Sequence, residues 1–140
     1  MTFEAIQPGL RGEARLIVAE EHTAKHLGSG AVQVLATPQM VLLMERAAVQ
    51  AVDPILPEGY RTVGSQLNIR HLAPTPLGFE VRATAELIEV EDRRLVFRVE
   101  VREEPFDEAH GGGEVVGDGT HQRAIIHIQR FSQRVAQKTK

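Results

Sequence analysis

The fold is decided by residues 37–54, Thr37-Pro38-Gln39-Met40-Val41-Leu42-Leu43-Met44-Glu45-Arg46-Ala47-Ala48-Val49-Gln50-Ala51-Val52-Asp53-Pro54. Thr37 is a favourable N-cap and Pro38 suits the first helical position. Strong helix formers then run from Gln39 to Val52, and Asp53-Pro54 ends the pattern. The predicted helix is apolar on nearly every side, whereas a surface helix shows one polar face. Other elements must therefore wrap around it.

On both sides of this helix the hydrophobic period is 2, as in strands. After the helix, apolar or small residues alternate with polar ones and predict a strand with one dry face, formed by Val63, Ser65, Leu67, Ile69 and His71. Further strands are expected over 13–18, 79–90, 95–102 and 114–128. Their expected inward side chains include Phe79, Val81, Ala83, Ala85, Leu87, Leu95, Phe97, Val99 and Val101.

Short connections join the later strands, with a hairpin turn at Glu91–Arg94 and a flexible hairpin loop at Gly111–Gly113. The tail from Gln129 is polar and basic. This order predicts an α+β protein, an antiparallel sheet of about five strands curled round one central helix, which is the hot-dog fold. Residues 1–140 are expected to form one domain. The helix keeps an open side, so we expect a homodimer and consider a tetramer.

Composition excludes several classes of protein. The 140 residues hold 16 basic and 19 acidic side chains, so we expect no nucleic-acid partner. The absence of cysteine excludes disulfides and thiol catalysis. No apolar run approaches the roughly 20 residues that span a bilayer, and no signal sequence is evident, so we expect a cytoplasmic protein with no membrane partner. His22 and His26 have metal-ligand spacing but lack a third ligand, so no metal is predicted.

Three side chains are candidates for chemistry. Glu45 lies among apolar helix residues without a basic partner one turn away, and an unpaired buried carboxylate is costly. Alternatively, it reaches solvent or pairs with an arginine of a partner chain. His71 is placed by strand alternation on the face that covers the helix, although a satisfied core histidine is a second interpretation. Thr37 is an N-cap at a helix N-terminus that can also stabilise an oxyanion.

Helix geometry restricts how these three groups meet. Eight residues separate Thr37 from Glu45, about 12 Å along a regular helix. Either residues 36–39 fold back before the helix begins, or the two working side chains come from different subunits. The arginines of the later strands, Arg93, Arg94, Arg98 and Arg102, either form a solvated face or meet substrate phosphates.

Three groups of residues carry a family resemblance. They are Thr37 with Met40–Glu45, Gly64 with His71 and the turn Thr75–Gly78, and the run Gly119-Thr120-His121-Gln122-Arg123-Ala124-Ile125-Ile126-His127. In this order they resemble the fluoroacetyl-CoA thioesterase group of hot-dog proteins, from about Gly12 to the C-terminal Lys138-Thr139.

The resemblance implies a homodimeric acyl-CoA thioesterase in which Thr37, Glu45 and His71 are catalytic. Glu45 would activate water or act as a nucleophile, His71 would position the thioester or the water, and Thr37 would orient these groups. Gly64 would lie against the acyl group. Coenzyme A would be part of the substrate, and no separate cofactor or metal is implied.

The sequence departs from this group in the residues expected to select the acyl chain. The resemblance implies aromatic residues before and around the helix, but none occurs between Phe3 and Tyr60, and Arg46 stands at one aromatic position. We therefore predict a broader or different short acyl group than fluoroacetyl. Two other functions stay open, a non-hydrolytic acyl-CoA binding module and an enoyl-CoA hydratase on the same fold.

Overall fold

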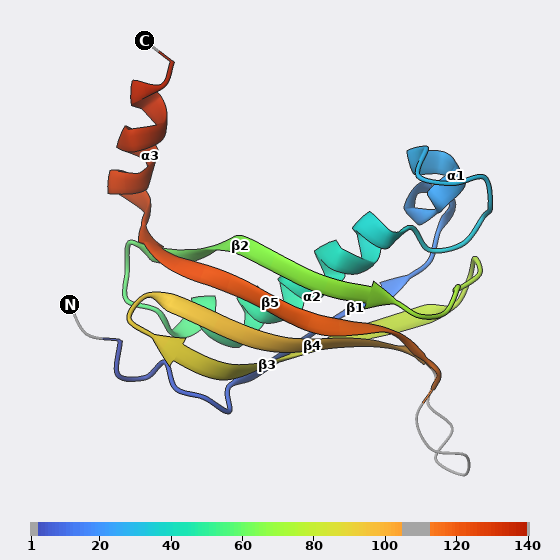
Figure 1. Cartoon of the computed structure of the whole chain (residues 1–140), viewed down its shortest axis with the longest axis horizontal. Helices are drawn as coiled ribbons and strands as arrows, with labels where there is room; N and C mark the ends of the chain where they lie inside the picture. Colours follow the sequence, from blue (N-terminus) through green and yellow to red (C-terminus); the bar gives the residue numbers. More distant parts are fainter. Residues whose placement is uncertain (1–2, 105–112, 140) are drawn as a thin grey trace.

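The computed structural model describes residues 3–104 and 113–139. Its elements follow the chain in the order β1 (Arg11–Ile17), η1 (Glu20–His22), α1 (Ala24–Leu27), α2 (Thr37–Val52), η2 (Asp53–Ile55), β2 (Tyr60–His71), β3 (Glu80–Glu91), β4 (Arg94–Glu104), β5 (Val115–His127) and α3 (Ile128–Gln137). The five strands form one antiparallel sheet in the order β1-β3-β4-β5-β2, and the sheet curls along α2 (Figure 1). The predicted hot-dog fold is confirmed.

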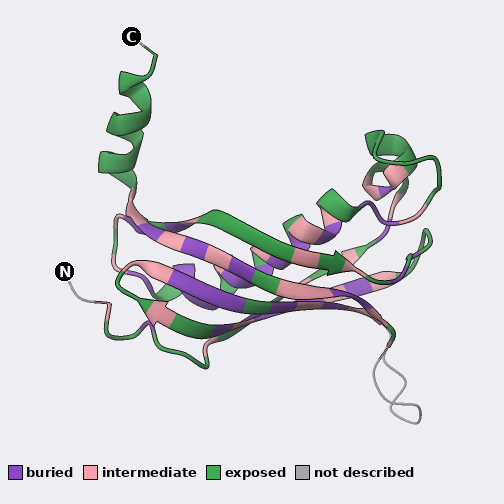
Figure 2. Ribbon diagram, in the orientation of Figure 1, coloured by how far each residue is buried: buried purple, intermediate pink, exposed green. Residues whose placement is uncertain are grey.

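The core lies between α2 and the concave face of the sheet (Figure 2). The helix contributes Met40, Leu43, Met44, Ala47 and Ala48, each at most 2% exposed. The predicted inward residues of β3 and β4 are buried from Val81 to Leu87 and from Leu95 to Val101. Phe79 precedes β3 and is 45% exposed, so its predicted inward position is wrong.

Helix α2 begins one residue earlier than predicted. Its N-cap is Ala36, which makes no side-chain capping bond, and Thr37 is already helical. The predicted N-cap role of Thr37 is therefore wrong, because its hydroxyl bonds to a strand residue instead of to the first turn. Residues 36–39 do not fold back, since Gln39 N and Met40 N both donate to Ala36 O as a helix begins.

Strand β2 is an edge of the sheet and contains a bulge between Gly64 and Gln66. The bulge changes which residues face α2, because each extra residue reverses the alternation. Thr62 faces α2 before the bulge and His71 does after it, so the predicted inward positions of Val63 and Ser65 are wrong. Leu67 is 44% exposed, so the face of β2 that was predicted to be buried is partly open to solvent in a single chain.

The C-terminal tail, expected to be polar and basic, forms helix α3, which projects from the end of β5 (Figure 1). Ile128, Phe131 and Val135 have helical spacing and are 38–49% exposed. Of the predicted loop Gly111–Gly113, the first two glycines lie outside the described residues. In the part of the chain that the structure describes, no helix combines the length and apolar character that crossing a bilayer requires.

Candidate functional site

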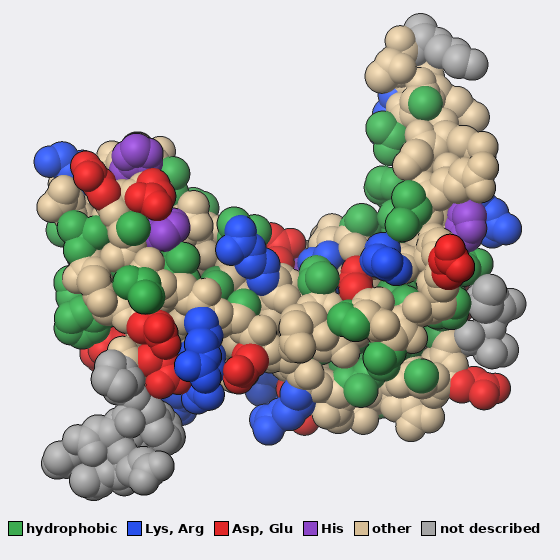
Figure 3. Space-filling model, turned by 180° about the vertical axis from the view of Figure 1, so that it is seen from behind, with side chains coloured by type: hydrophobic (Ala, Val, Ile, Leu, Met, Phe, Trp, Pro, Cys, Tyr) green, Lys and Arg blue, Asp and Glu red, His purple; other side chains and the backbone are tan. Residues whose placement is uncertain are grey.

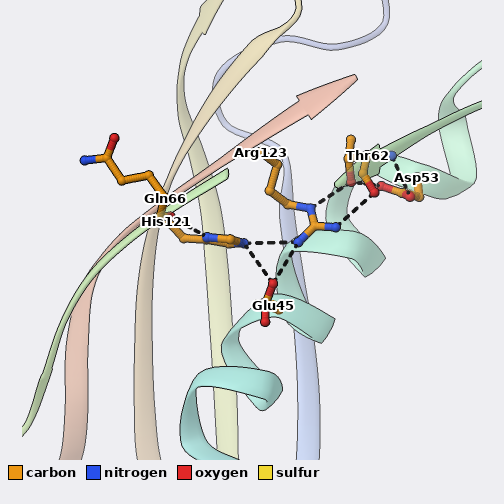
Figure 4. Close-up of polar contacts among 6 residues, drawn as sticks. All are labelled: Glu45, Asp53, Thr62, Gln66, His121 and Arg123. Atoms are coloured by element: carbon orange, nitrogen blue, oxygen red, sulfur yellow. Dashed lines mark hydrogen bonds and ion pairs between the residues drawn. The ribbon is translucent and has the colours of Figure 1, made fainter. Parts of the chain in front are cut away.

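The middle of α2 carries a cluster of charged and polar side chains that faces the sheet (Figure 4). Glu45 projects from α2 toward β5, where Arg123 Nη1 lies 3.5 Å from Glu45 Oε2 and His121 Nε2 lies 4.0 Å from the same oxygen. The Glu45 side chain is 33% exposed, whereas those of His121 and Arg123 are 0% and 6% exposed. We call these three residues the central cluster. The Glu45 carboxylate is thus partly exposed to solvent, whereas the two basic side chains beside it are buried.

The protonation of His121 follows from its two neighbours. Its Nδ1 lies 2.9 Å from Gln66 O, which only accepts, and its Nε2 lies 3.1 Å from Arg123 Nη1, which only donates. The ring therefore carries its proton on Nδ1 and is neutral. Burial is the main cause that lowers the pKa of His121, Arg123 lowers it further, and the Gln66 carbonyl and Glu45 oppose this.

Arg123 is the charged partner of Glu45. A guanidinium stays protonated in proteins, so its Nη1 donates to both Glu45 Oε2 and His121 Nε2. Burial lowers the pKa of Arg123, and Asp53 and Glu45 partly restore it. Because Glu45 Oε2 lies near two bases of which only the guanidinium is charged, the ion pair of the cluster is Glu45–Arg123. Glu45 was expected to reach solvent or to pair with an arginine of a partner chain; its side chain is 33% exposed, and the arginine that it pairs with belongs to the same chain.

Gly64 lies directly over this cluster. A Cβ atom built at this position would meet Glu45 Oε2 at 2.7 Å, His121 Cε1 at 3.3 Å and Arg123 Nη1 at 3.4 Å. The missing side chain therefore lets the Glu45 carboxylate approach the backbone of β2. Beside it, a groove of about 500 Å³ is lined by Leu42, Glu45, Arg46, Val49, Gln50 and Arg123.

A second pair of polar residues lies at the N-terminus of α2. Thr37 Oγ1 is 2.7 Å from His71 Nδ1, and His71 Nε2 is buried without a hydrogen-bond partner among the described residues. Burial lowers the pKa of His71, with the backbone of Ala73 partly opposing. A hollow of about 330 Å³ adjoins the pair and is lined by Ala24, Ser29, Val34, Leu35, Thr37, His71, Leu72, Ala73 and Pro74. We call Thr37 and His71 the terminal pair.

The structure separates the three predicted catalytic residues within one chain. Thr37 and His71 are in contact, whereas Glu45 lies two turns further along α2 with Arg123 and His121 as partners. The imidazole that faces Glu45 is thus His121 and not His71. Among the arginines of the later strands, Arg94 pairs with Glu89 and Glu91 at the surface, and Arg102 pairs with Glu100. Arg93 instead lies over the rings of Phe3 and Tyr60.

His121 and Arg123 were not singled out as site residues from the sequence. A signal was present, because the two alternate with the buried Ile125 and so share the inward face of β5. For metal binding, no group of three or more His, Cys, Asp or Glu side chains occurs within residues 3–104 and 113–139. His22 Nδ1 instead accepts a hydrogen bond from Ala19 N.

Comparison with known proteins gives consistent relatives. The model of the fluoroacetyl-CoA-specific thioesterase family matches residues 18–129. The fluoroacetyl-CoA thioesterase of Streptantibioticus cattleyicolor is 38% identical over 97% of this chain and 96% of its own length. A solved structure of a mutant of the fluoroacetyl-CoA protein FlK in complex with acetyl-CoA is 37% identical, with a TM-score of 0.82 over 96% of this chain and 100% of that one. A thioesterase superfamily member from Thermus thermophilus is 29% identical, with a TM-score of 0.83 over 96% and 93% of the two chains.

Proposed function

Because the chain belongs to the fluoroacetyl-CoA-specific thioesterase family, we propose that it is an acyl-CoA thioesterase that hydrolyses short-chain acyl-CoA thioesters. The observation that carries this proposal is a carboxylate, Glu45, held by a buried guanidinium at the edge of a groove. Coenzyme A enters as part of the substrate, in keeping with the acetyl-CoA complex of the related FlK mutant. A cytoplasmic location stays a prediction.

Glu45 is proposed as the general base. Its carboxylate takes a proton from a water molecule, and the oxygen of that water attacks the thioester carbonyl carbon. The C–S bond then breaks, the acid is released and the CoA thiolate is protonated. Arg123 supports this role because its buried guanidinium holds the carboxylate in place at the edge of the groove. Direct attack by Glu45 on the carbonyl carbon, through an anhydride that water then hydrolyses, is the alternative for the same residue.

The terminal pair is proposed to complete the site across a dimer. With the Thr37 hydroxyl donating to His71 Nδ1, the ring proton sits on Nε2, the atom that has no partner in one chain. This N–H can then donate to the thioester carbonyl or to the attacking water. Since about 12 Å of helix separates the pair from Glu45, the pair that meets Glu45 belongs to the partner subunit.

The surface of the chain supports such a dimer. Strand β2 is an edge of the sheet, and Leu67 on it and Leu42 on the open side of α2 are 44% and 38% exposed. Segments α1 and α3 rise at opposite ends of this edge, and the surface between them is hollowed in the view from behind (Figure 1, Figure 3). A second copy placed antiparallel along β2 would cover these apolar side chains.

The acyl group is proposed to be short but not selectively fluorinated. Arg46, exposed beside Glu45, borders the groove where an aromatic residue was expected, and the part of the chain before Tyr60 has no aromatic side chain after Phe3. We expect comparable kcat/KM for acetyl-CoA and fluoroacetyl-CoA. A strong preference for the fluorinated substrate in a series that includes longer acyl chains would contradict this.

The decisive experiment is the substitution Glu45→Gln. Because general-base catalysis is worth about 10²–10⁴-fold, kcat for acetyl-CoA should fall by that factor. Binding of CoA, measured by calorimetry, should change little. A variant that hydrolyses acetyl-CoA like the wild type would count against the thioesterase and favour a non-hydrolytic acyl-CoA binding module. Addition of water to crotonyl-CoA by the wild type would instead favour a hydratase.

A further inference from the structure

The C-terminal end of α2 carries a buried acid that the proposed mechanism does not use. Asp53 is 8% exposed and follows directly after the helix. A negative charge is unfavourable at this end of a helix, because the helix dipole places partial negative charge there. Burial adds a further cost. Asp53 must therefore have strong compensating partners.

The partners of Asp53 form a chain of hydrogen bonds toward the central cluster (Figure 4). Thr62 on β2 donates from its backbone N to Asp53 Oδ2 at 3.1 Å and from its hydroxyl to Asp53 Oδ1 at 2.6 Å. Arg123 then donates from Nε to the Thr62 hydroxyl at 2.8 Å and from Nη2 to the Thr62 carbonyl at 3.0 Å. Each group along the chain is thereby satisfied.

The direction of these bonds fixes the guanidinium. The Thr62 hydroxyl has one proton, which it gives to Asp53, so its oxygen is left to accept from Arg123 Nε. With Nε and Nη2 both held by Thr62, the rigid plane of the guanidinium directs Nη1 toward Glu45. A lysine or a freely rotating arginine would not be directed in this way.

We propose that Asp53 and Thr62 are positioning residues, which orient Arg123 so that it holds the Glu45 carboxylate in its working place. This inference rests on the proposed function for its catalytic consequence. Neither residue borders the groove beside Glu45. Their effect on hydrolysis is therefore transmitted through Arg123 and not through contact with substrate.

The test compares two substitutions of one residue. Thr62→Val keeps the shape but removes the hydroxyl, whereas Thr62→Ser keeps the hydroxyl. For acetyl-CoA hydrolysis, Thr62→Val should lower kcat about 10- to 100-fold, the scale of a misplaced catalytic group, with KM within about twofold. A fall confined to kcat is expected because the substrate does not touch Thr62, whereas the carboxylate that Arg123 holds is displaced. Thr62→Ser should restore most of the lost kcat.

A second buried threonine provides the control for loss of a hydroxyl. Thr75 is 0% exposed and its Oγ1 has no hydrogen-bond partner among the described residues. Thr75→Val should therefore leave kcat and KM unchanged. Melting temperatures of all three variants separate loss of activity from loss of folded protein. Equal kcat for Thr62→Val and Thr62→Ser would overturn the inference.

A readout without turnover separates this inference from the proposed function. The Nε–H signal of Arg123, assigned by its loss in Arg123→Lys, should exchange slowly with solvent in the wild type and in Thr62→Ser. It should exchange faster in Thr62→Val. Unchanged exchange in Thr62→Val would refute the orienting role even if the enzyme is a thioesterase. Absence of hydrolysis by the wild type would refute the proposed function while this exchange experiment still tests the orientation.

Discussion

The central cluster and the terminal pair each join one residue of α2 to the sheet, but they differ in how their polar atoms are satisfied. In the central cluster, every side-chain nitrogen of Arg123 and His121 has a hydrogen-bond partner, and the Glu45 side chain is 33% exposed. In the terminal pair, His71 Nε2 is buried and unpartnered. The difference indicates that the central cluster is complete within one chain, whereas the terminal pair is built to receive a group from outside it.

The largest expected effect tests whether the two sites work together across subunits. Glu45→Gln and His71→Gln should each reduce hydrolysis about 10²-fold or more. If both are mixed, unfolded and refolded together, half of the dimers are mixed and each of these has one intact site. About a quarter of the wild-type activity should then return.

The matched control mixes Glu45→Gln with the double variant Glu45→Gln/His71→Gln, which can form no intact site. This mixture should stay inactive. If the first mixture is no more active than the mean of its components, Glu45 and His71 do not act across a dimer interface. The central cluster and the terminal pair would then differ only in how much each contributes to the stability of the fold.

The second prediction compares how much the central cluster and the terminal pair contribute to the stability of the fold. Arg123→Met removes the buried guanidinium that pairs with Glu45 and donates to Thr62, and it should lower the free energy of unfolding by about 3 kcal/mol. Thr37→Val removes one hydrogen bond at an exposed position and should cost about 1 kcal/mol or less. Urea unfolding followed by circular dichroism measures both. Equal losses in the free energy of unfolding would show that the central cluster contributes no more to stability than the terminal pair.

The elements that carry the two groups of residues are predictable from the sequence where local patterns define them. The apolar stretch from Met40 to Val52 and the period-2 strands identify α2, β3 and β4, because each pattern reports burial directly. Helix α3 was missed since its tail was interpreted by charge, although Ile128, Phe131 and Val135 have helical spacing. Its apolar side chains pack on little of the core, so the composition there resembles a solvated tail.

Partners across the sheet could not be predicted in the same way. Arg123 follows Glu45 by 78 residues, and their contact depends on the register of β5 against β2 and on the bulge after Gly64. A bulge of one residue reverses every later side chain, and its signal in residues 60–71 is the isolated Gly64, which the strand alternation overrode. Strand alternation therefore placed His71 on the helix side of β2 but did not identify which part of α2 it meets.

The third prediction concerns the close approach of Glu45 to β2. In Gly64→Ala the added methyl group would meet Glu45 Oε2 at 2.7 Å, so the carboxylate must move away from its place above Arg123. We expect kcat to fall about tenfold or more, since small misplacements of a catalytic group are costly. Gly78→Ala, at a turn with open space around it but φ of +87°, controls for a general effect of replacing glycine on stability. If Gly64→Ala keeps full kcat, the carboxylate does not need this position.

The smallest expected effect is the pH dependence of stability contributed by His71. Burial lowers the pKa of His71 in the folded chain, with the Ala73 backbone partly opposing, so the unfolded chain takes up a proton at higher pH than the folded one. The neutral ring therefore stabilises the fold fully above about pH 6.5, and this contribution is lost as the pH falls through the lower folded value. Replacing His71 by Gln should make the decline in unfolding free energy between about pH 6.5 and 5 less steep, while the exposed His26→Gln serves as control. Burial also lowers the pKa of His121, so a shallow decline should persist in His71→Gln and disappear only when His121 is replaced as well.

If the curves of the wild type and His71→Gln run parallel, the buried ring of the terminal pair is not held neutral by its surroundings. The unpartnered Nε2 would then not indicate a group that binds from outside the chain.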